Sequence, residues 1–144
     1  MSAESARQLK SVLKRAARHR EPVEAVRSMA LAYVRFARES PHLYGLLMTP
    51  CTPSEEDAES HQDLWNFVVD QVALISTQSR AREAAVALWA LLHGTVALEA
   101  AQVFGEEKPF SGFDFGLEAW LTAAANHADS TSGRLRKSAG LAKR

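Results

Sequence analysis

Two side chains that could carry chemistry lie one helical turn apart near the middle of the chain. Trp89 and His93 fall on one face of the helix that the segment ALWALLHGTVALE predicts. In a ligand site, the imidazole would hydrogen bond a polar group of a molecule held against the indole. In an ordinary core, Trp89 would pack and His93 would bond a backbone carbonyl of a neighbouring helix. The sequence leaves both interpretations open.

The other residues that could line a ligand site are apolar or aromatic and recur at helical spacing. Ligand sites in helical proteins lie between helices and combine such residues with a few polar anchors. The same spacing is also typical of a plain hydrophobic core. The candidate wall residues are Tyr33, Phe36, Leu47, Met48, Trp65 and Phe67.

Motifs for catalysis or metal binding are missing from the sequence. It contains no H-E-x-x-H, G-x-S-x-G or C-x-x-C motif and no glycine-rich phosphate loop. Its five histidines are scattered, and its one cysteine, Cys51, has no basic neighbour in the sequence to activate the thiol. We therefore expect no catalytic activity and no bound cofactor or metal.

Apolar stripes at helical spacing run through most of the chain, and prolines and polar segments separate them. There is no strand pattern. Ser54 and Ser79 are the expected N-caps of the fourth and fifth helices, and His61 belongs to the apolar stripe of the fourth. The sequence predicts an all-α fold of about six helices, over residues 5–20, 22–39, 41–48, 54–77 and 82–104, with a last helix that follows 110–114 and reaches about 128.

The helix predicted over residues 82–104 is apolar on both sides and must be covered on both sides. On one side, small residues alternate with leucine as in a heptad seam, and the last helix carries a second such seam. In a chain this short, we expect one side to meet the core and the other to meet a second subunit. The predicted interface residues are Ala87, Leu91, Gly94, Leu98, Ala101, Leu117, Leu121 and Ala124.

The charge of the chain is balanced overall but unevenly distributed. Its 144 residues have a net charge of zero, yet residues 1–20 carry +5, residues 129–144 carry +4 and the segment between them carries −9. An acidic body disfavours nucleic-acid binding by the main domain. We expect one folded domain over residues 1–128, followed by a basic tail over 129–144 with too few apolar residues to fold.

The sequence carries no signal for export or membrane insertion. Its basic N-terminal segment lacks the unbroken apolar core of a signal peptide. The longest uncharged run, Ala84–Leu98, is shorter than the roughly 20 residues that span a bilayer. We expect a cytoplasmic protein without membrane contact.

Three segments together resemble a known family. The central segment contains Trp89, His93 and Gly94 in the spacing W-x-x-x-H-G, AYVRFARESPHLYGLLM lies upstream and FDFGLEAWL lies downstream. Their order and spacing resemble the C-terminal domain of TetR/AcrR-type transcriptional regulators, in the subgroup named for its Trp-His-Gly (WHG) motif. The resemblance extends over residues 1–128.

The resemblance implies an all-helical domain that encloses a cavity for a small, mostly apolar effector. It also implies a homodimer in which the last two long helices of each subunit form a four-helix bundle. Ligand binding in such a domain shifts the spacing of two DNA-reading heads. The site residues expected for the effector are Tyr33, Phe36, Met48, Trp65, Trp89 and His93.

The resemblance also implies where DNA binding would come from. Regulators of this type carry an N-terminal helix-turn-helix, which this sequence lacks, and residues 1–20 correspond to the helix that connects it to the sensing domain. We expect DNA binding only if such a segment precedes the chain in the native gene. The alternative is a structural module that homo- or heterodimerises through its C-terminal helices and binds no ligand.

Overall fold

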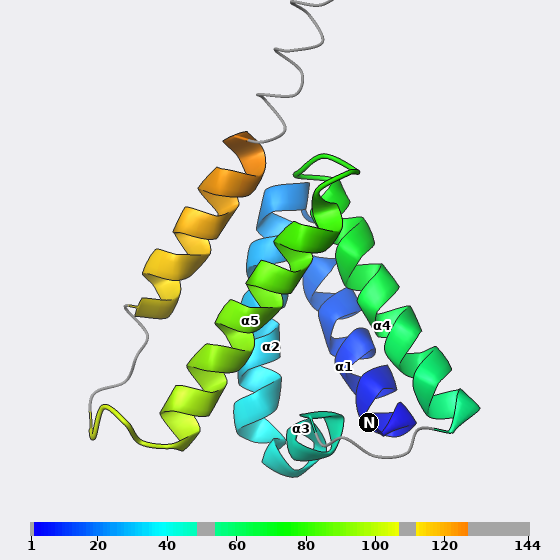
Figure 1. Cartoon of the computed structure of the whole chain (residues 1–144), viewed down its shortest axis with the longest axis vertical. Helices are drawn as coiled ribbons and strands as arrows, with labels where there is room; N and C mark the ends of the chain where they lie inside the picture. Colours follow the sequence, from blue (N-terminus) through cyan, green and yellow to red (C-terminus); the bar gives the residue numbers. More distant parts are fainter. Residues whose placement is uncertain (1, 49–53, 107–111, 127–144) are drawn as a thin grey trace, which may run out of the picture.

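The computed structural model describes residues 2–48, 54–106 and 112–126, and this part of the chain contains helices and turns but no strand (Figure 1). The predicted all-α fold is confirmed, with six helices in the described residues. Cys51 and the tail expected over 129–144 lie outside them. The helices are α1 (Ala3–Ala17), α2 (Pro22–Glu39), α3 (Pro41–Met48), α4 (Glu55–Ala73), α5 (Ala81–Ala100) and a last helix over residues 112–126.

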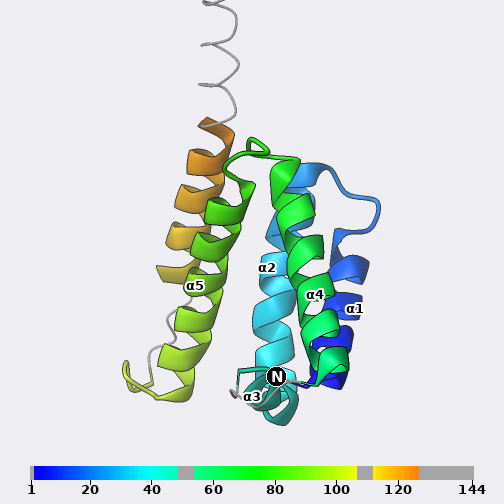
Figure 2. The ribbon, with the colours of Figure 1, turned by 45° about the vertical axis from the view of Figure 1, so that its right-hand side comes forward.

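The helices surround one main hydrophobic core to which all six contribute. In Figure 1, α4 and α5 converge near the connection between them and diverge toward their other ends, with α1 and α2 behind and α3 across the wide end. The last helix runs beside α5, on the side away from α1 and α4 (Figure 2).

The start of α4 is fixed by side-chain capping, as its sequence predicts. Ser54 accepts a hydrogen bond from the Asp57 backbone N–H, and the Asp57 carboxylate accepts one from the Ser54 backbone N–H. The same carboxylate accepts a hydrogen bond of 2.7 Å from the backbone N–H of Ala3, at the start of α1. One side chain therefore caps α4 and holds the beginning of α1 against it.

The ends of α5 differ from the sequence prediction of residues 82–104 with a Ser79 cap. The helix begins after Arg80, which makes no side-chain cap, and the Ser79 hydroxyl instead bonds that of Thr77. It ends at Ala100, because Gln102 adopts a left-handed φ of 54° that breaks the helical path. The apolar pattern continues through 101–104, so the pattern alone overextends the helix.

The last helix is anchored on two sides. Trp120 donates from Nε1 to the Ala84 carbonyl oxygen of α5 at 2.8 Å. On α2, the Arg27 guanidinium forms a bidentate pair with Glu118, at 3.0 Å for both contacts. These contacts orient the apolar face of the last helix toward the core.

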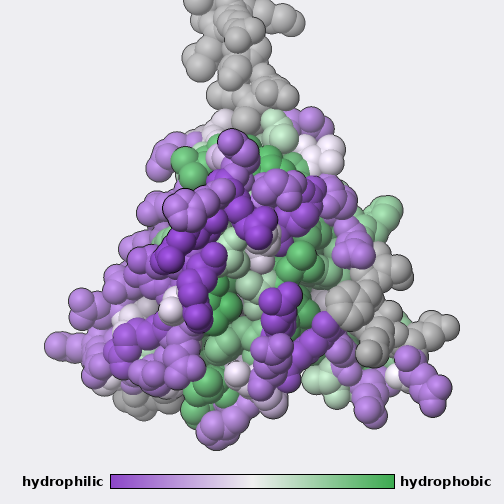
Figure 3. Space-filling view, turned by 180° about the vertical axis from the view of Figure 1, so that it is seen from behind, coloured by the Kyte–Doolittle hydropathy of each residue, from purple (hydrophilic) through white to green (hydrophobic). Residues whose placement is uncertain are grey.

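By length and composition alone, α5 is apolar enough to cross a membrane. This is weak evidence for a membrane span, because a helix in the core of a soluble protein passes the same test. Here α5 packs against α2 and α4. From behind, hydrophilic side chains cover much of the molecule, with hydrophobic groups in a strip down the middle (Figure 3).

Candidate functional site

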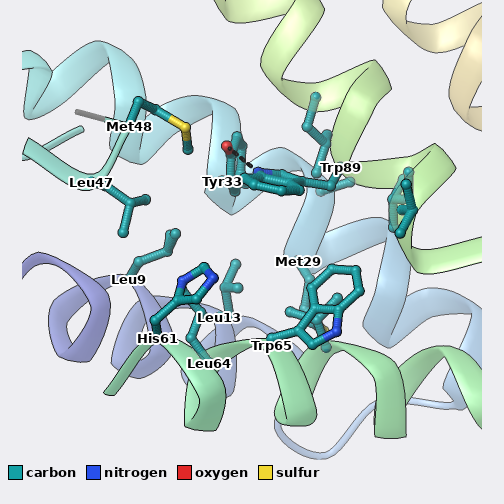
Figure 4. A pocket seen from close by; sticks show the side chains of 15 residues that line it. Leu9, Leu13, Met29, Tyr33, Leu47, Met48, His61, Leu64, Trp65 and Trp89 are labelled. Carbon is teal, nitrogen blue, oxygen red and sulfur yellow. Dashed lines mark hydrogen bonds between the residues drawn. The ribbon is translucent and has the colours of Figure 1, made fainter. Parts of the chain in front are cut away.

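An apolar cavity of about 240 Å³ lies between α4 and α5 on one side and α1 and α2 on the other (Figure 4). Because five helices supply its wall, the cavity depends on the tertiary fold. Such a wall suits a small apolar molecule. The lining residues are Leu9, Leu13, Met29, Ala30, Tyr33, Leu47, Met48, His61, Leu64, Trp65, Val68, Val86, Leu88, Trp89 and Leu92.

Two indoles form part of the cavity wall. The rings of Trp65 and Trp89 lie 6.2 Å apart between centroids, with their planes tilted by 53°. Trp89 is 37% exposed and its neighbour Val86 is 50% exposed, although both line the cavity. The cavity therefore borders solvent along one side of α5.

A chain of hydrogen bonds holds the Trp89 side chain in place. Its Nε1–H donates to the Tyr33 hydroxyl of α2 at 3.1 Å, and this hydroxyl bonds that of Tyr44 on α3 at 3.1 Å. The Tyr44 hydroxyl in turn bonds Nδ1 of His93, back on α5. These hydrogen bonds connect the Trp89 side of the cavity wall to α3, and they satisfy polar groups that the fold buries.

The phenol groups of Tyr33 and Tyr44 in this hydrogen-bond network stay neutral. Burial, reinforced by the hydrogen bond with Tyr44, raises the pKa of Tyr33 far above its ordinary value. Burial also raises the pKa of Tyr44. The two hydroxyls therefore act as hydrogen-bond donors and acceptors and carry no charge into the cavity wall.

Neither interpretation of His93 from the sequence describes its surroundings. Although His93 lies one turn from Trp89, its side chain does not line the cavity, and its partner is a tyrosine hydroxyl rather than a backbone carbonyl. Spacing on a helix gives a shared face, but Trp89 reaches α2 whereas His93 reaches α3. His93 therefore supports the wall from behind.

The remaining predicted wall residues divide into two groups. Tyr33, Leu47, Met48 and Trp65 come together along the cavity with Trp89. Phe36 is buried in the core and Phe67 packs on its edge under the Lys14 ammonium group, and neither lines the cavity.

Ten of the fifteen cavity-lining residues were not among the predicted site residues, and His61 is the polar one of these ten. His61 projects from α4 into the cavity, and its Nδ1 is buried without a hydrogen-bond partner among the described residues (Figure 4). The sequence did contain a signal, because His61 is the polar member of an otherwise apolar stripe with Leu64, Trp65 and Val68. A polar residue at a core-facing position indicates either a buried partner or a ligand.

A comparison with known protein families identifies the family of this chain. The model of the tetracycline repressor-like C-terminal domain matches residues 26–119, more than half of the chain. The chain belongs to this family. The predicted relationship to TetR-type regulators is thereby confirmed. A search of curated proteins finds no match.

Membership of the TetR-like family bears on the expected chemistry. Domains of this kind are regulatory rather than enzymatic. Within the described residues, no three His, Cys, Asp or Glu side chains gather as a metal site would require.

The structure corrects the predicted interface on the last helix. Leu117, Leu121 and Ala124 are at most 6% exposed and pack in the core of their own chain. A heptad seam has the same spacing as a core-facing stripe, so the pattern does not reveal which chain covers it. Three buried residues are not available to a second subunit.

The predicted interface residues on α5 differ in their surroundings. Leu91 is half-buried against Gly116 of the last helix, so its own chain covers it. Gly94 is half-buried, but a Cβ at this position would meet nothing within 4 Å among the described residues. Ala87, Leu98 and Ala101 are exposed. The outward-facing apolar surface therefore lies on only part of the predicted seam.

Proposed function

We propose that the chain is the ligand-sensing and dimerisation domain of a TetR-type transcriptional regulator, and that it binds a small, mostly apolar effector in the cavity. The observation that carries this proposal is the cavity itself, whose hydrocarbon and aromatic wall comes from five helices. The alternative function, a dimerising module without a ligand, does not require such a cavity. The regulator would act in the cytoplasm as a homodimer.

The same wall suggests how an effector would change the domain. Leu9 and Leu13 of α1 face the cavity opposite Trp89 and Leu92 of α5. An effector that fills the space would alter the separation of α1 and α5, as in other transitions that move helices by small shifts. Because residues 1–20 correspond to the connecting helix of TetR-type regulators, this shift would reach any DNA-reading segment attached to it.

A cavity-filling substitution tests the proposal. Ala30 is fully buried and lines the cavity, so Ala30→Leu adds carbon atoms where the effector would lie. We use ethylbenzene as an apolar probe and follow thermal unfolding by circular dichroism. At about ten times its Kd, a bound probe stabilises the folded state by about 1.4 kcal/mol. We expect the melting temperature of the wild-type protein to rise and that of Ala30→Leu to change much less.

A matched variant separates cavity filling from the general effect of a larger side chain. Ala58 is exposed on α4, so Ala58→Leu should respond to ethylbenzene as the wild type does. If neither the wild type nor Ala58→Leu responds to ethylbenzene, the ligand-free structural module becomes the better description. An equal response in Ala30→Leu would place the probe outside this cavity.

A further inference from the structure

We propose that the effector is an uncharged molecule with an apolar body and one hydroxyl or carbonyl group, and that His61 hydrogen bonds this group. This inference rests on the proposed function, because it assigns a chemical class to the effector of the same cavity. It follows from an unpartnered polar atom, the absence of charge in the described wall and the size of the cavity.

His61 is the polar side chain of the cavity wall whose buried nitrogen has no partner among the described residues. Among the described residues lining the cavity, its Nδ1 is the one buried side-chain nitrogen or oxygen without a hydrogen-bond partner. Leaving such an atom unpaired destabilises a folded protein, so native structures pair nearly all of them. Rotation about the Cβ–Cγ bond of histidine costs little energy over a broad range of angles, and it brings this nitrogen toward the cavity that the ring already lines.

The other polar groups in this region already have partners. The Trp89 Nε1–H donates to the Tyr33 hydroxyl, which also bonds Tyr44. An effector that bonded Tyr33 would have to compete with these contacts, whereas one that bonds His61 satisfies an atom that has none. A hydroxyl can donate to one tautomer of the imidazole and accept from the other, and a carbonyl can accept from an N–H.

Apart from the His61 imidazole, the described wall offers no side chain that could pair with an ionised effector. None of its fifteen residues is Lys, Arg, Asp or Glu. Burying an unpaired carboxylate or ammonium in such a wall is strongly unfavourable. The site therefore favours a neutral polar group over an acid or an amine.

The size of the cavity limits the apolar body. An engineered cavity of about 150 Å³ in another protein binds benzene, so about 240 Å³ accommodates one ring with a short substituent or a short branched chain. Trp65 and Trp89 offer aromatic surfaces to such a body. The effector class is thus a small neutral alcohol, ketone or aldehyde with a ring or short chain.

The test compares three probes that share a phenyl ring. Ethylbenzene has no polar group, 2-phenylethanol adds a hydroxyl and phenylacetate adds a carboxylate. Binding to the wild-type protein and to His61→Leu is measured by titration calorimetry, with quenching of tryptophan fluorescence as a second signal. The decisive quantity is the preference ratio, the Kd of ethylbenzene divided by that of 2-phenylethanol.

We expect His61→Leu to lower the preference ratio by about three- to tenfold, which corresponds to one lost hydrogen bond. His61→Gln, which keeps a donor and an acceptor, should retain part of the preference. His42 is an exposed histidine on α3, and His42→Leu should leave the ratio unchanged. Phenylacetate should bind the wild type more weakly than 2-phenylethanol.

The outcomes distinguish this inference from the function on which it rests. If ethylbenzene binds the wild type but the ratio is the same in His61→Leu, the anchor is wrong and the cavity remains an effector site. Tighter binding of phenylacetate would overturn the neutral class. If no probe binds the wild type, the proposed function fails and the inference fails with it.

Thermal unfolding without ligand gives an independent readout. If His61 were retained for structure, His61→Leu would lower the melting temperature. Because Nδ1 has no partner among the described residues, we expect the melting temperature of His61→Leu to equal or exceed that of the wild type. A clear drop would show that His61 serves the fold, and would count against the anchor.

Discussion

Tyr33 is one of the two inner members of the hydrogen-bond network at the cavity wall. Its hydroxyl accepts from Trp89 and bonds Tyr44, and its side chain is 4% exposed. Tyr44 stands at the next link and bonds His93, whose side chain is exposed. The two tyrosines therefore differ in what their removal would leave behind. Without the Tyr33 hydroxyl, the Trp89 N–H loses its partner and the Tyr44 hydroxyl keeps only His93.

We expect Tyr33→Phe to destabilise the domain by about 1–3 kcal/mol, because it leaves the part-buried Trp89 N–H without its partner and removes one of the two hydrogen bonds of the Tyr44 hydroxyl. In Tyr44→Phe, Tyr33 keeps Trp89 as its partner and His93 can turn to water, so the loss should be smaller. Urea unfolding of the two variants followed by circular dichroism measures the difference. An equal decrease in the free energy of unfolding, or a larger decrease in Tyr44→Phe, would contradict the larger contribution that we assign to the Tyr33 hydroxyl.

The sequence identified five of the fifteen cavity-lining residues but not their hydrogen-bond partners. Stripes at helical spacing were sufficient to select Tyr33, Met48, Trp65 and Trp89, because each lies on the side of its helix that faces the interior of the protein. They could not separate these from Phe36, since a core face and a cavity face have the same periodicity. The contact between His93 and Tyr44 joins residues 49 positions apart, and no local pattern predicts it.

At the scale of the elements, the start of α4 joins two helices through one carboxylate. Asp57 accepts hydrogen bonds from the backbone N–H groups of Ser54 and Ala3. Hydrogen bonding with the Ser54 side chain, followed by that from the Ala3 backbone, lowers the pKa of Asp57 below its ordinary value. The sequence made this start visible through a serine before three acids, whereas the contact with α1 depends on the tertiary fold.

The lowered pKa of Asp57 predicts a dependence of stability on pH. Because the pKa is lower in the folded than in the unfolded state, the stabilisation is complete above the unfolded value and is lost as the pH falls through the folded value. We expect Asp57→Asn to reduce the loss of melting temperature between pH 5 and pH 2, roughly the range over which aspartates titrate. Asp63→Asn, on the same helix, serves as the control. An unchanged acid slope in Asp57→Asn would contradict the role of this carboxylate.

The ends of α5 show where an apolar pattern loses predictive power. The pattern extends to Phe104, yet the helix stops at Ala100 because Gln102 takes a left-handed conformation that Gly or Asn adopts more readily. Gly105, the residue that the sequence offers as a stop, lies beyond this point. Tertiary context therefore sets this end, and residues 101–106 leave the helix as turns.

At the scale of the whole molecule, the exposed apolar residues indicate where a second subunit would pack. Phe115 of the last helix is 79% exposed, although Leu117 and Leu121 on the same helix are buried. On α5, Leu98 is 43% exposed. These two residues belong to the helices that the TetR resemblance assigns to the four-helix bundle, but they lie on the faces that the core leaves uncovered. A homodimer through these faces is a proposal that extends the sensing function.

A charge on the outer face of the last helix tests the dimer. Phe115→Glu alters a residue that contributes little to the fold of a single chain, because exposed substitutions usually change stability by less than about 0.5 kcal/mol. In a subunit interface, the same carboxylate would be buried without a partner and would oppose its symmetry mate. We expect sedimentation velocity to give a dimer for the wild type and a monomer for Phe115→Glu, with unchanged helical circular dichroism. Leu74 lies at the end of α4 and is 63% exposed, and the variant Leu74→Glu should remain dimeric. A wild-type monomer at micromolar concentration would remove the dimer from the proposal, and a dimer that persists in Phe115→Glu would place its interface on another face.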